Sequence, residues 1–264
     1  MFVDSHCHLS DASLASQMDQ VLLQMQQARV TQALCISTTL ADFEQVRQLA
    51  HTHANLWASI GVHPENEHDQ EPLKSDLLSR AADARVVAIG ETGLDYFQFG
   101  ERSHAQMQWQ RDRFSTHIEA AREAALPLVI HTRAAAADTV AMLKEAVNGP
   151  GKIQGVFHCF TETMDVARQA LDLGFYISFS GILTFKNAAQ LREVAQMVPH
   201  DACLIETDSP YLAPVPYRGK TNMPAYVPYV AAVLADLWRT DAAHVGGQTT
   251  RNFETLFAKV KGTA

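Results

Sequence analysis

The chain has 264 residues, 47% of them hydrophobic, and a formal net charge of −8 at pH 7. The acidic excess argues against a protein that coats nucleic acid with a broad basic face, but it permits an enzyme that binds a few phosphates through metal ions and local arginines. No run of about eighteen apolar residues is present, so we expect no membrane span. Four singly placed cysteines and a strand-like N-terminus that does not resemble a signal peptide predict a cytoplasmic protein.

Short apolar runs alternate with amphipathic stretches along the chain. Helical spacing is seen at 15–30 and 104–125, and two closing helices are expected near the C-terminus, the second from Asp241 onward. Strands that alternate with helices predict parallel βαβ units, here within a single domain over 1–264. In chain order, the strand-like runs lie at 2–8, 32–39, 56–64, 86–95, 127–133, 154–160, 175–181 and 203–211.

This succession of strands predicts an α/β fold, the (β/α)8 TIM barrel, more strongly than a doubly wound sheet. A doubly wound sheet would usually carry a glycine-rich phosphate turn after an early strand. The chain instead reads "HLSDASLA" at 8–15. Because active-site residues of TIM barrels collect at the C-terminal ends of the strands, functional residues should be sought there.

Histidines and acidic residues gather at these predicted strand ends. His6 and His8 share a face of the first strand, because alternate side chains of a strand point the same way. A lone histidine in a strand is more often a hydrogen-bonded core residue than a ligand. Neighbouring imidazoles and buried carboxylates are costly to desolvate, however, and one metal site that binds them all would offset this cost for every member. The later strand ends carry His63, Glu91, His131, His158, Glu206 and Asp208.

The number of donors indicates more than one cation. Four of these imidazoles and two of these carboxylates already exceed what a single tetrahedral zinc needs. They suit two divalent cations about 3.5–4 Å apart, bridged by a carboxylate and a hydroxide that attacks a phosphoryl or carbonyl group. The mixed nitrogen and oxygen set favours zinc or manganese over calcium, and magnesium could replace them.

Six short segments, spread over nearly the whole chain, carry a family resemblance. In order and barrel placement they resemble the TatD-type metal-dependent deoxyribonucleases of the amidohydrolase-like superfamily. The segments read "DSHCHL" (4–9), "GVHP" (61–64), "AIGETGLDY" (88–96), "IHTR" (130–133), "HCFT" (158–161) and "ETDSPYLAP" (206–214).

The resemblance implies a ligand for each end of a metal pair. His6 and His8 would bind the first metal, His131 and His158 the second, and Glu91 would bridge the two. The set is complete in this chain, so two ions are expected.

The resemblance also implies a reaction. Asp208 would ligate the first metal and take the proton from the attacking water. The implied chemistry is phosphodiester hydrolysis in DNA, as a 3′–5′ exonuclease on single-stranded ends. One departure is Ala134, where the family commonly has an aspartate; loss of that helix cap should cost about 1 kcal/mol. Another is Met223, in place of a common glutamate, and neither departure touches a proposed ligand.

Two further acids are expected beneath the ligands. Glu206 shares strand parity with Asp208 and should sit one layer deeper, where it would support catalysis by orienting a ligand. Asp4 has the same standing beneath His6. A buried structural carboxylate is the alternative for each.

Substrate-binding residues are expected at the rim. Arg133 could hold a phosphate in bidentate fashion, although a surface salt bridge is as compatible with its position. His63, followed by a proline and a turn, is also predicted to bind substrate. The proline-stiffened loop 209–224 carries Lys220 as a further phosphate-binding residue and Tyr211 as a stacking group for a base.

Two other functions remain open from the residues alone. The same metal-bound hydroxide could cleave an ester or amide in a small molecule or an aminoacyl-tRNA. A metal-holding barrel that serves protein association is less compatible with a complete ligand set, and no obligate protein partner is indicated. A nuclease should surround its metals with cations and stacking groups, whereas a small-molecule hydrolase should have a closed apolar pocket.

Overall fold

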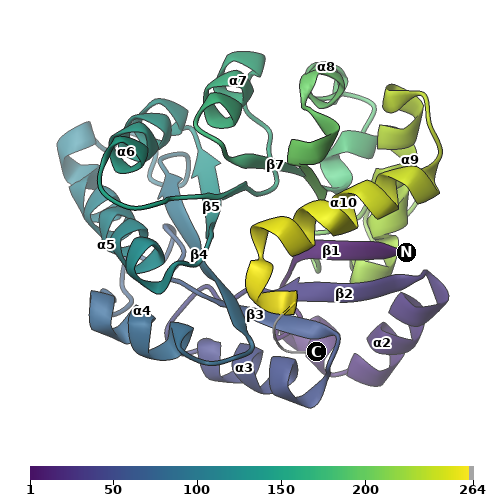
Figure 1. The fold of residues 1–264 in the computed structure, drawn as a ribbon, viewed down its shortest axis with the longest axis horizontal. Helices are drawn as coiled ribbons and strands as arrows, with labels where there is room; N and C mark the ends of the chain where they lie inside the picture. Colours follow the sequence, from purple (N-terminus) through teal and green to yellow (C-terminus); the bar gives the residue numbers. More distant parts are fainter. Residues whose placement is uncertain (262–264) are drawn as a thin grey trace.

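The structure, a computed structural model, describes residues 1–261 and contains eight parallel strands that follow one another around a barrel (Figure 1). The predicted TIM-barrel fold is confirmed. The domain extent of 1–264 stays a prediction, because its last three residues lie outside the described ones. The strands are β1 Phe2–Cys7, β2 Val30–Cys35, β3 Leu56–Ile60, β4 Val86–Asp95, β5 Leu128–Arg133, β6 Gly155–Phe157, β7 Tyr176–Phe179 and β8 Cys203–Ile205.

The last strand meets the first just beyond its own end. Cys7 and Ser209 form an isolated parallel bridge, and the His8 N–H donates to the Ser209 carbonyl at 2.8 Å. The Asp208 N–H donates to the His6 carbonyl at 3.0 Å. Strand β8 ends at Ile205 and is shorter than the predicted 203–211 run, within which Asp208 takes a φ of +56° that no strand residue adopts.

Helices cover the outside of the barrel between successive strands (Figure 1). The α-helices are α1 Ala12–Ala15, α2 Met18–Gln27, α3 Phe43–Thr52, α4 Lys74–Ala81, α5 Gln108–Ala124, α6 Ala136–Asn148, α7 Met164–Asp172, α8 Ala189–Met197, α9 Val227–Trp238 and α10 Ala242–Leu256. Short 3-10 turns are η1 His104–Met107, η2 Gly181–Thr184, η3 His200–Ala202, η4 Pro224–Tyr226 and η5 Ala258–Lys261. No described helix is long and apolar enough to cross a membrane.

The two longest predicted helical segments differ slightly from their expected bounds. The 15–30 segment forms α2 only from Met18, and the 104–125 segment begins as the 3-10 turn η1 before α5. The closing helix begins where expected, because the Asp241 side chain caps α10 by accepting the His244 N–H at 2.7 Å.

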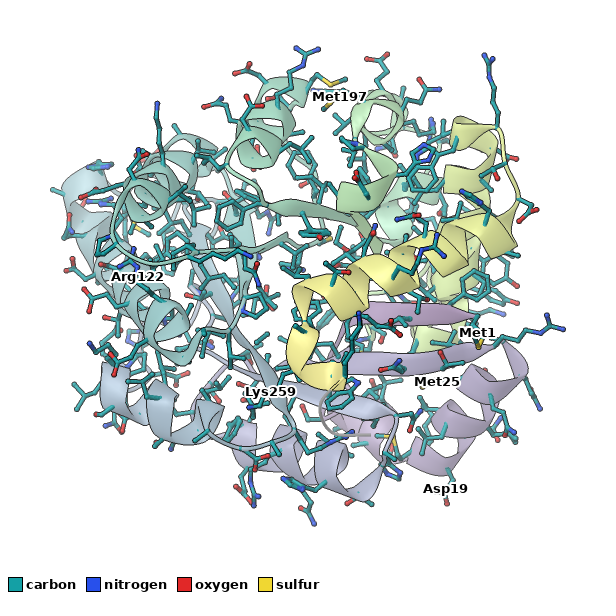
Figure 2. The ribbon with its side chains drawn as sticks, in the orientation of Figure 1. Met1, Asp19, Met25, Arg122, Met197 and Lys259 are labelled. Carbon is teal, nitrogen blue, oxygen red and sulfur yellow. The ribbon has the colours of Figure 1, made fainter. Side chains whose placement is uncertain are left out.

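Helix α10 crosses the N-terminal end of the barrel (Figure 1). Its Phe253, and Phe257 directly after its end, are fully buried against strand side chains that include Val3 and Val129. Beyond α10, the Lys259 ammonium (labelled in Figure 2) donates to the carbonyls of Ala81 and Asp83. The N-terminal end is thus closed by apolar packing, which leaves the C-terminal end for a polar site.

Candidate metal centre

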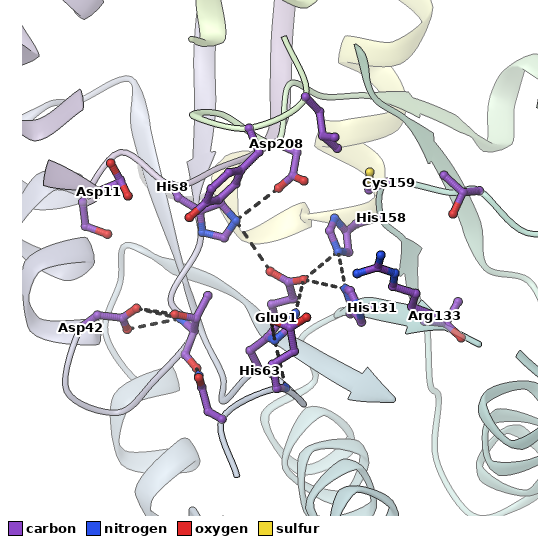
Figure 3. Close-up of a pocket in the computed structure, with 18 of the residues that line it drawn as sticks. His8, Asp11, Asp42, His63, Glu91, His131, Arg133, His158, Cys159 and Asp208 are labelled. Carbon is purple, nitrogen blue, oxygen red and sulfur yellow. Dashed lines mark hydrogen bonds and ion pairs between the residues drawn. The ribbon is translucent and has the colours of Figure 1, made fainter. Parts of the chain in front are cut away.

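The strand-end histidines and acids meet in one cluster at the C-terminal mouth of the barrel (Figure 3). They come from β1, β4 and β5 and from the residues that follow β1, β3, β6 and β8. Three groups have donor atoms mutually within 4.8 Å: His6, Glu91 and His158; His6, His8 and Asp208; and His63, Glu91 and His131.

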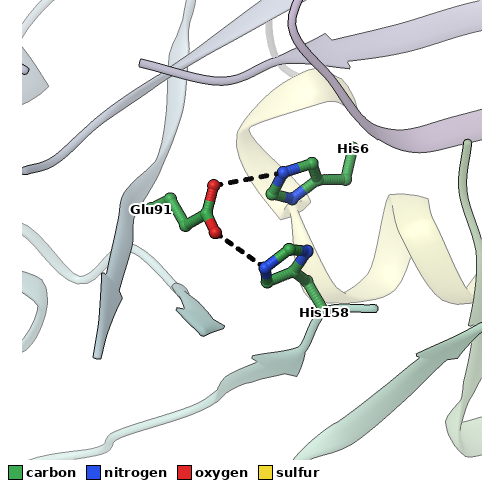
Figure 4. A group of neighbouring side chains, drawn as sticks. All are labelled: His6, Glu91 and His158. Carbon is green, nitrogen blue, oxygen red and sulfur yellow. Dashed lines mark ion pairs between the residues drawn. The ribbon is translucent and has the colours of Figure 1, made fainter. Parts of the chain in front are cut away.

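Glu91 lies at the centre of the cluster and offers one oxygen to each side. Its Oε2 is 3.3 Å from His6 Nε2, and its Oε1 is 2.7 Å from His158 Nε2 (Figure 4). Burial raises the pKa of this carboxyl, but the imidazoles around it, His158 foremost, outweigh burial and hold the pKa well below its usual range. Glu91 is therefore an ionised, buried carboxylate with nitrogen donors on both sides.

The β1/β8 half of the cluster consists of His6, His8 and Asp208. The Nε2 atoms of His6 and His8 are 3.2 Å apart, and Asp208 Oδ1 is 3.3 Å from His8 Nε2 and 3.5 Å from His6 Nε2. Asp208 can take its left-handed backbone conformation at low cost because aspartate tolerates that region, and the hydrogen bond to the His6 carbonyl holds it there.

The β5/β6 half consists of His131 and His158, each backed by a carboxylate. His131 Nε2 donates to Asp95 Oδ2 at 2.9 Å, and His158 Nδ1 donates to Glu206 Oε1 at 3.3 Å. With those nitrogens protonated, His131 presents the lone pair of Nδ1 to the cluster and His158 presents that of Nε2. The acids behind the two imidazoles thereby select the ring nitrogen that faces the cluster and that a cation would bind.

A glycine lets strand β4 pass close to the backbone of β5 between Glu91 and Asp95. Gly93 has a φ of +132°, and a Cβ there would collide with the His131 carbonyl. Glycine is therefore required between Glu91 and Asp95.

His63 has the opposite arrangement to His131 and His158, because its protonated nitrogen faces the cluster. The Glu65 N–H donates to His63 Nδ1 at 3.1 Å, so the proton of this neutral imidazole is on Nε2. That Nε2 lies 3.2 Å from Glu91 Oε1, where it acts as a hydrogen-bond donor and not as a lone-pair donor. The geometry distinguishes His63 from the other imidazoles of the cluster.

A cavity of about 810 Å³ opens above the cluster, with walls of unequal charge. Asp11, Asp42 and Glu65 line it together with a single arginine, Arg133, and Asp11 and Asp42 lie on the side away from Arg133 (Figure 3). The Arg133 guanidinium makes no ion pair within the described part of the chain. It lies 3.9 Å from the ring centroid of Phe97 instead.

The donor set fits a divalent cation. Neutral imidazole nitrogens and carboxylate oxygens converge from strands that are distant in sequence, and the tautomers of His131 and His158 leave their lone pairs facing inward. Such mixed donors are typical of zinc, manganese and similar ions.

Comparison with known proteins identifies the family. The family model described as "TatD related DNase" matches residues 3–258. The chain belongs to the TatD family.

Full-length relatives agree with this assignment. The chain is 47% identical over 259 residues to an uncharacterized metal-dependent hydrolase, YcfH, of Escherichia coli K12, covering 97% of this chain and 95% of the relative. It is 32% identical to a protein of Klebsiella pneumoniae named 3′-5′ ssDNA/RNA exonuclease TatD, covering 96% of this chain and 97% of that protein. The crystal structure of the TatD homologue YJJV of Escherichia coli K12 superposes with a TM-score of 0.87 at 27% identity, over 97% of this chain and 98% of that one. The protein is therefore a metal-dependent hydrolase of the TatD family.

Most of the residues selected from the sequence lie at this mouth. The ligand roles of His6, His8, Glu91, His131, His158 and Asp208 stay predictions, but all six lie in the cluster. Arg133 and Tyr211 line the cavity. Lys220 is not among the lining residues and lies 5.9 Å from the ring of Tyr217, so its substrate-binding role has no support from position.

Asp95 is the residue that sequence reasoning missed. Its carboxylate is fully buried and holds His131, yet no role was expected for it. The available signal was parity: Asp95 is two alternations beyond Glu91 on the same strand, so it points to the same side.

The structure also settles the positions of two neighbouring residues. Alternation from His158 would point Cys159 away from the site, but Cys159 lines the cavity with its Sγ 3.1 Å from Ser180 Oγ. Strand alternation no longer applies there, because β6 has ended and Cys159 has a φ of +42°. Asp4 holds backbone and not the His6 ring: its Oδ1 accepts the N–H groups of His6 and Thr207.

Proposed function

We propose that this protein is a two-cation phosphodiesterase that degrades DNA from single-stranded 3′ ends. The observation that carries the proposal is the placement of Glu91, which has one carboxylate oxygen toward each half of the cluster. The relative named as a 3′-5′ ssDNA/RNA exonuclease supports DNA as the substrate class.

In this proposal His6, His8 and Asp208 hold the first cation, and His131 and His158 hold the second. Zinc or manganese suits the donors best, and bound cations would polarise the phosphate and lower the pKa of an attacking water. Asp208 is the base that accepts the proton of this water, since its carboxylate faces the cavity.

The remaining residues orient and bind. Glu206 and Asp95 fix the imidazoles of His158 and His131. His63 donates its Nε2–H to an oxygen of the scissile phosphate, which agrees with its tautomer. Arg133 binds a phosphate, because its unpaired guanidinium is held at the cavity wall by the Phe97 ring.

The uneven charge of the cavity supports action at an end. A strand that crossed the whole mouth would bring phosphates against Asp11, Asp42 and Glu65, where like charges repel. A strand end could enter from the Arg133 side alone. On that side Phe97, with 59% of its side chain exposed, lies against Arg133 and is available to stack on a base. Tyr211, 58% exposed, lies on the opposite side, near His8.

The acidic wall also favours a second candidate function. Asp11, Asp42 and Glu65 would attract an ammonium group, as found in a peptide-like substrate or an aminoacyl ester. In that case the same centre would hydrolyse an ester or amide, as in the wider amidohydrolase-like superfamily.

A cytoplasmic location is retained as a prediction, supported by four cysteines that are all unpaired.

One experiment separates the two functions. Protein loaded with Mn²⁺ or Zn²⁺ is incubated with 5′-labelled single-stranded DNA and, in parallel, with ester and amide substrates, each with and without EDTA. Stepwise shortening from the 3′ end that stops with EDTA supports the exonuclease. Carbonyl cleavage with intact DNA would replace it with the second candidate.

A further inference from the structure

The buried carboxylate of Asp95 divides its two oxygens between two tasks. Oδ1 accepts the backbone N–H groups of Phe97, at 2.9 Å, and Gln98, at 3.2 Å, which anchors the loop after β4. Oδ2 accepts the Nε2–H of His131 at 2.9 Å. Asp95 has 0% exposure and belongs to none of the donor groups that could hold a metal ion.

This division fixes the proton of His131. An ionised carboxylate can only accept hydrogen bonds, so the facing Nε2 must carry the proton and Nδ1 keeps its lone pair. Nδ1 is the atom that faces the cluster, 3.2 Å from Glu91 Oε1.

We propose that Asp95 is a positioning residue that selects the metal-binding tautomer of His131 and so determines occupancy of the second cation site. The proposal rests on the two-cation reading of the centre. It requires no contact between Asp95 and a cation or substrate.

The arrangement makes the isosteric substitution Asp95→Asn more damaging than its size suggests. Two backbone N–H groups point at the Oδ1 position and only one imidazole at Oδ2, so the amide oxygen of Asn will face Phe97 and Gln98. The amide NH₂ then faces His131 Nε2, which must become the acceptor. The proton moves to Nδ1, which points it at Glu91 and removes the lone pair that a cation needs.

Asp95→Ala has the opposite profile. It deletes the loop anchor and leaves a buried gap, so it lowers thermal stability more than Asn does. It places no donor against His131 Nε2, however, so the metal-binding tautomer stays accessible. The tautomer role therefore predicts that Asn impairs metal binding more than Ala does, whereas a purely structural role predicts that Ala impairs it more.

The test is a calorimetric titration of chelator-treated protein with Mn²⁺, combined with 15N NMR of histidine-labelled protein to assign the His131 tautomer. We expect wild type to bind two ions. Asp95→Asn should weaken the second by about tenfold to 100-fold and show the Nδ1–H tautomer, and Asp95→Ala should weaken it less while melting at a lower temperature.

Asp42→Asn is the matched control. Asp42 lines the cavity and, like Asp95, accepts two backbone N–H groups, here from Thr38 and Thr39, but it makes no hydrogen bond to an imidazole of the described residues. Asp42→Asn removes one negative charge, as Asp95→Asn does, but both ions should still bind.

The outcomes separate this inference from the proposed function. A wild type that binds one ion overturns the two-cation reading and the inference with it. Two ions in wild type with unchanged affinity in Asp95→Asn, or a larger loss in Asp95→Ala than in Asp95→Asn, overturn the role of Asp95 and leave the proposed function standing.

Discussion

The two halves of the centre fix their imidazoles in different ways. In the β5/β6 half, carboxylates behind His131 and His158 decide which nitrogen faces inward. In the β1/β8 half no carboxylate stands behind His6, and its Nδ1 is buried without a hydrogen-bond partner among the described residues. The β1/β8 half therefore relies on Asp208, which lies inside the cluster, whereas the β5/β6 half relies on Asp95 and Glu206, which lie behind its imidazoles.

Stacking connects the halves. The rings of His6 and His158 lie parallel, with centroids 3.9 Å apart and an interplanar angle of 9°. Burial, followed by repulsion from His158, lowers the pKa of His6. Burial also lowers the pKa of His158, but Glu91 outweighs it and raises that pKa well above its usual value. A cation that binds at His158 Nε2 would therefore have to displace a proton.

The largest effect is expected where the halves meet. Glu91→Gln keeps the size of the side chain but removes the shared charge, so both cations should bind weakly and DNA hydrolysis should fall by about 10³-fold or more. Exonuclease rates at saturating Mn²⁺ measure the loss. Glu145→Gln, on the exposed surface of α6, is the control, and full activity in Glu91→Gln would refute the bridging role.

Removing one acid from each half should reduce activity in different ways in the two halves. Asp208→Asn loses a ligand and the proton acceptor, so kcat should fall by about 10²–10⁴-fold without rescue by added metal. Glu206→Ala removes the acceptor of the His158 Nδ1–H and of the Cys159 N–H, so activity should fall about tenfold to 100-fold and recover as Mn²⁺ is raised. Kinetics of both variants across a metal titration test this, and rescue of Asp208→Asn would contradict it.

A buried histidine outside both halves provides a reference for the imidazoles. His117 accepts the Val62 N–H at Nε2 and donates from Nδ1 to the Arg113 carbonyl, and burial lowers its pKa to about 4. The folded state therefore resists protonation that the unfolded state accepts below about pH 6.5. Stability that His117 confers is present above that pH and is lost as the pH falls towards 4.

His117→Gln should show this loss as a difference. Between pH 7.5 and pH 5, the gap in unfolding free energy between wild type and variant should shrink by about 2 kcal/mol, measured by urea denaturation. His244→Gln, at an exposed site, should show no such change. A gap for His117→Gln that is independent of pH would show that the buried imidazole is not the titrating group.

The smallest effect concerns the aromatic side chains beside each half. Phe97 lies against Arg133 on the β5 side, whereas Tyr211 is 6.1 Å from His8. Stacking of a base on Phe97 predicts that Phe97→Ala raises KM about tenfold for single-stranded DNA but not for the same strand with abasic ends.

Two comparisons complete this test. Tyr211→Ala shows whether the β1/β8 side also stacks a base, and Leu73→Ala removes an equally exposed apolar side chain elsewhere. An equal effect of Phe97→Ala on both substrates would exclude base stacking.

The sequence was informative wherever a strict period applied. Alternating apolar runs predicted the barrel because each strand must bury side chains on both faces. The alternation of side chains along a strand placed His6 with His8 on one face. The shared direction of parallel strands places their C-terminal ends at one mouth of the barrel. Side-chain alternation no longer applies just past the strand ends, as at Cys159, where φ is positive.

Local periodicity and the shared direction of parallel strands were enough to predict the eight strands and the residues that converge at one mouth. Which nitrogen each imidazole presents depends instead on Asp95, Glu206 and the Glu65 N–H, whose contacts arise from packing. The tertiary structure also decided that Arg133 reaches the cavity while Lys220 does not, since loop positions follow from contacts that no short-range pattern encodes.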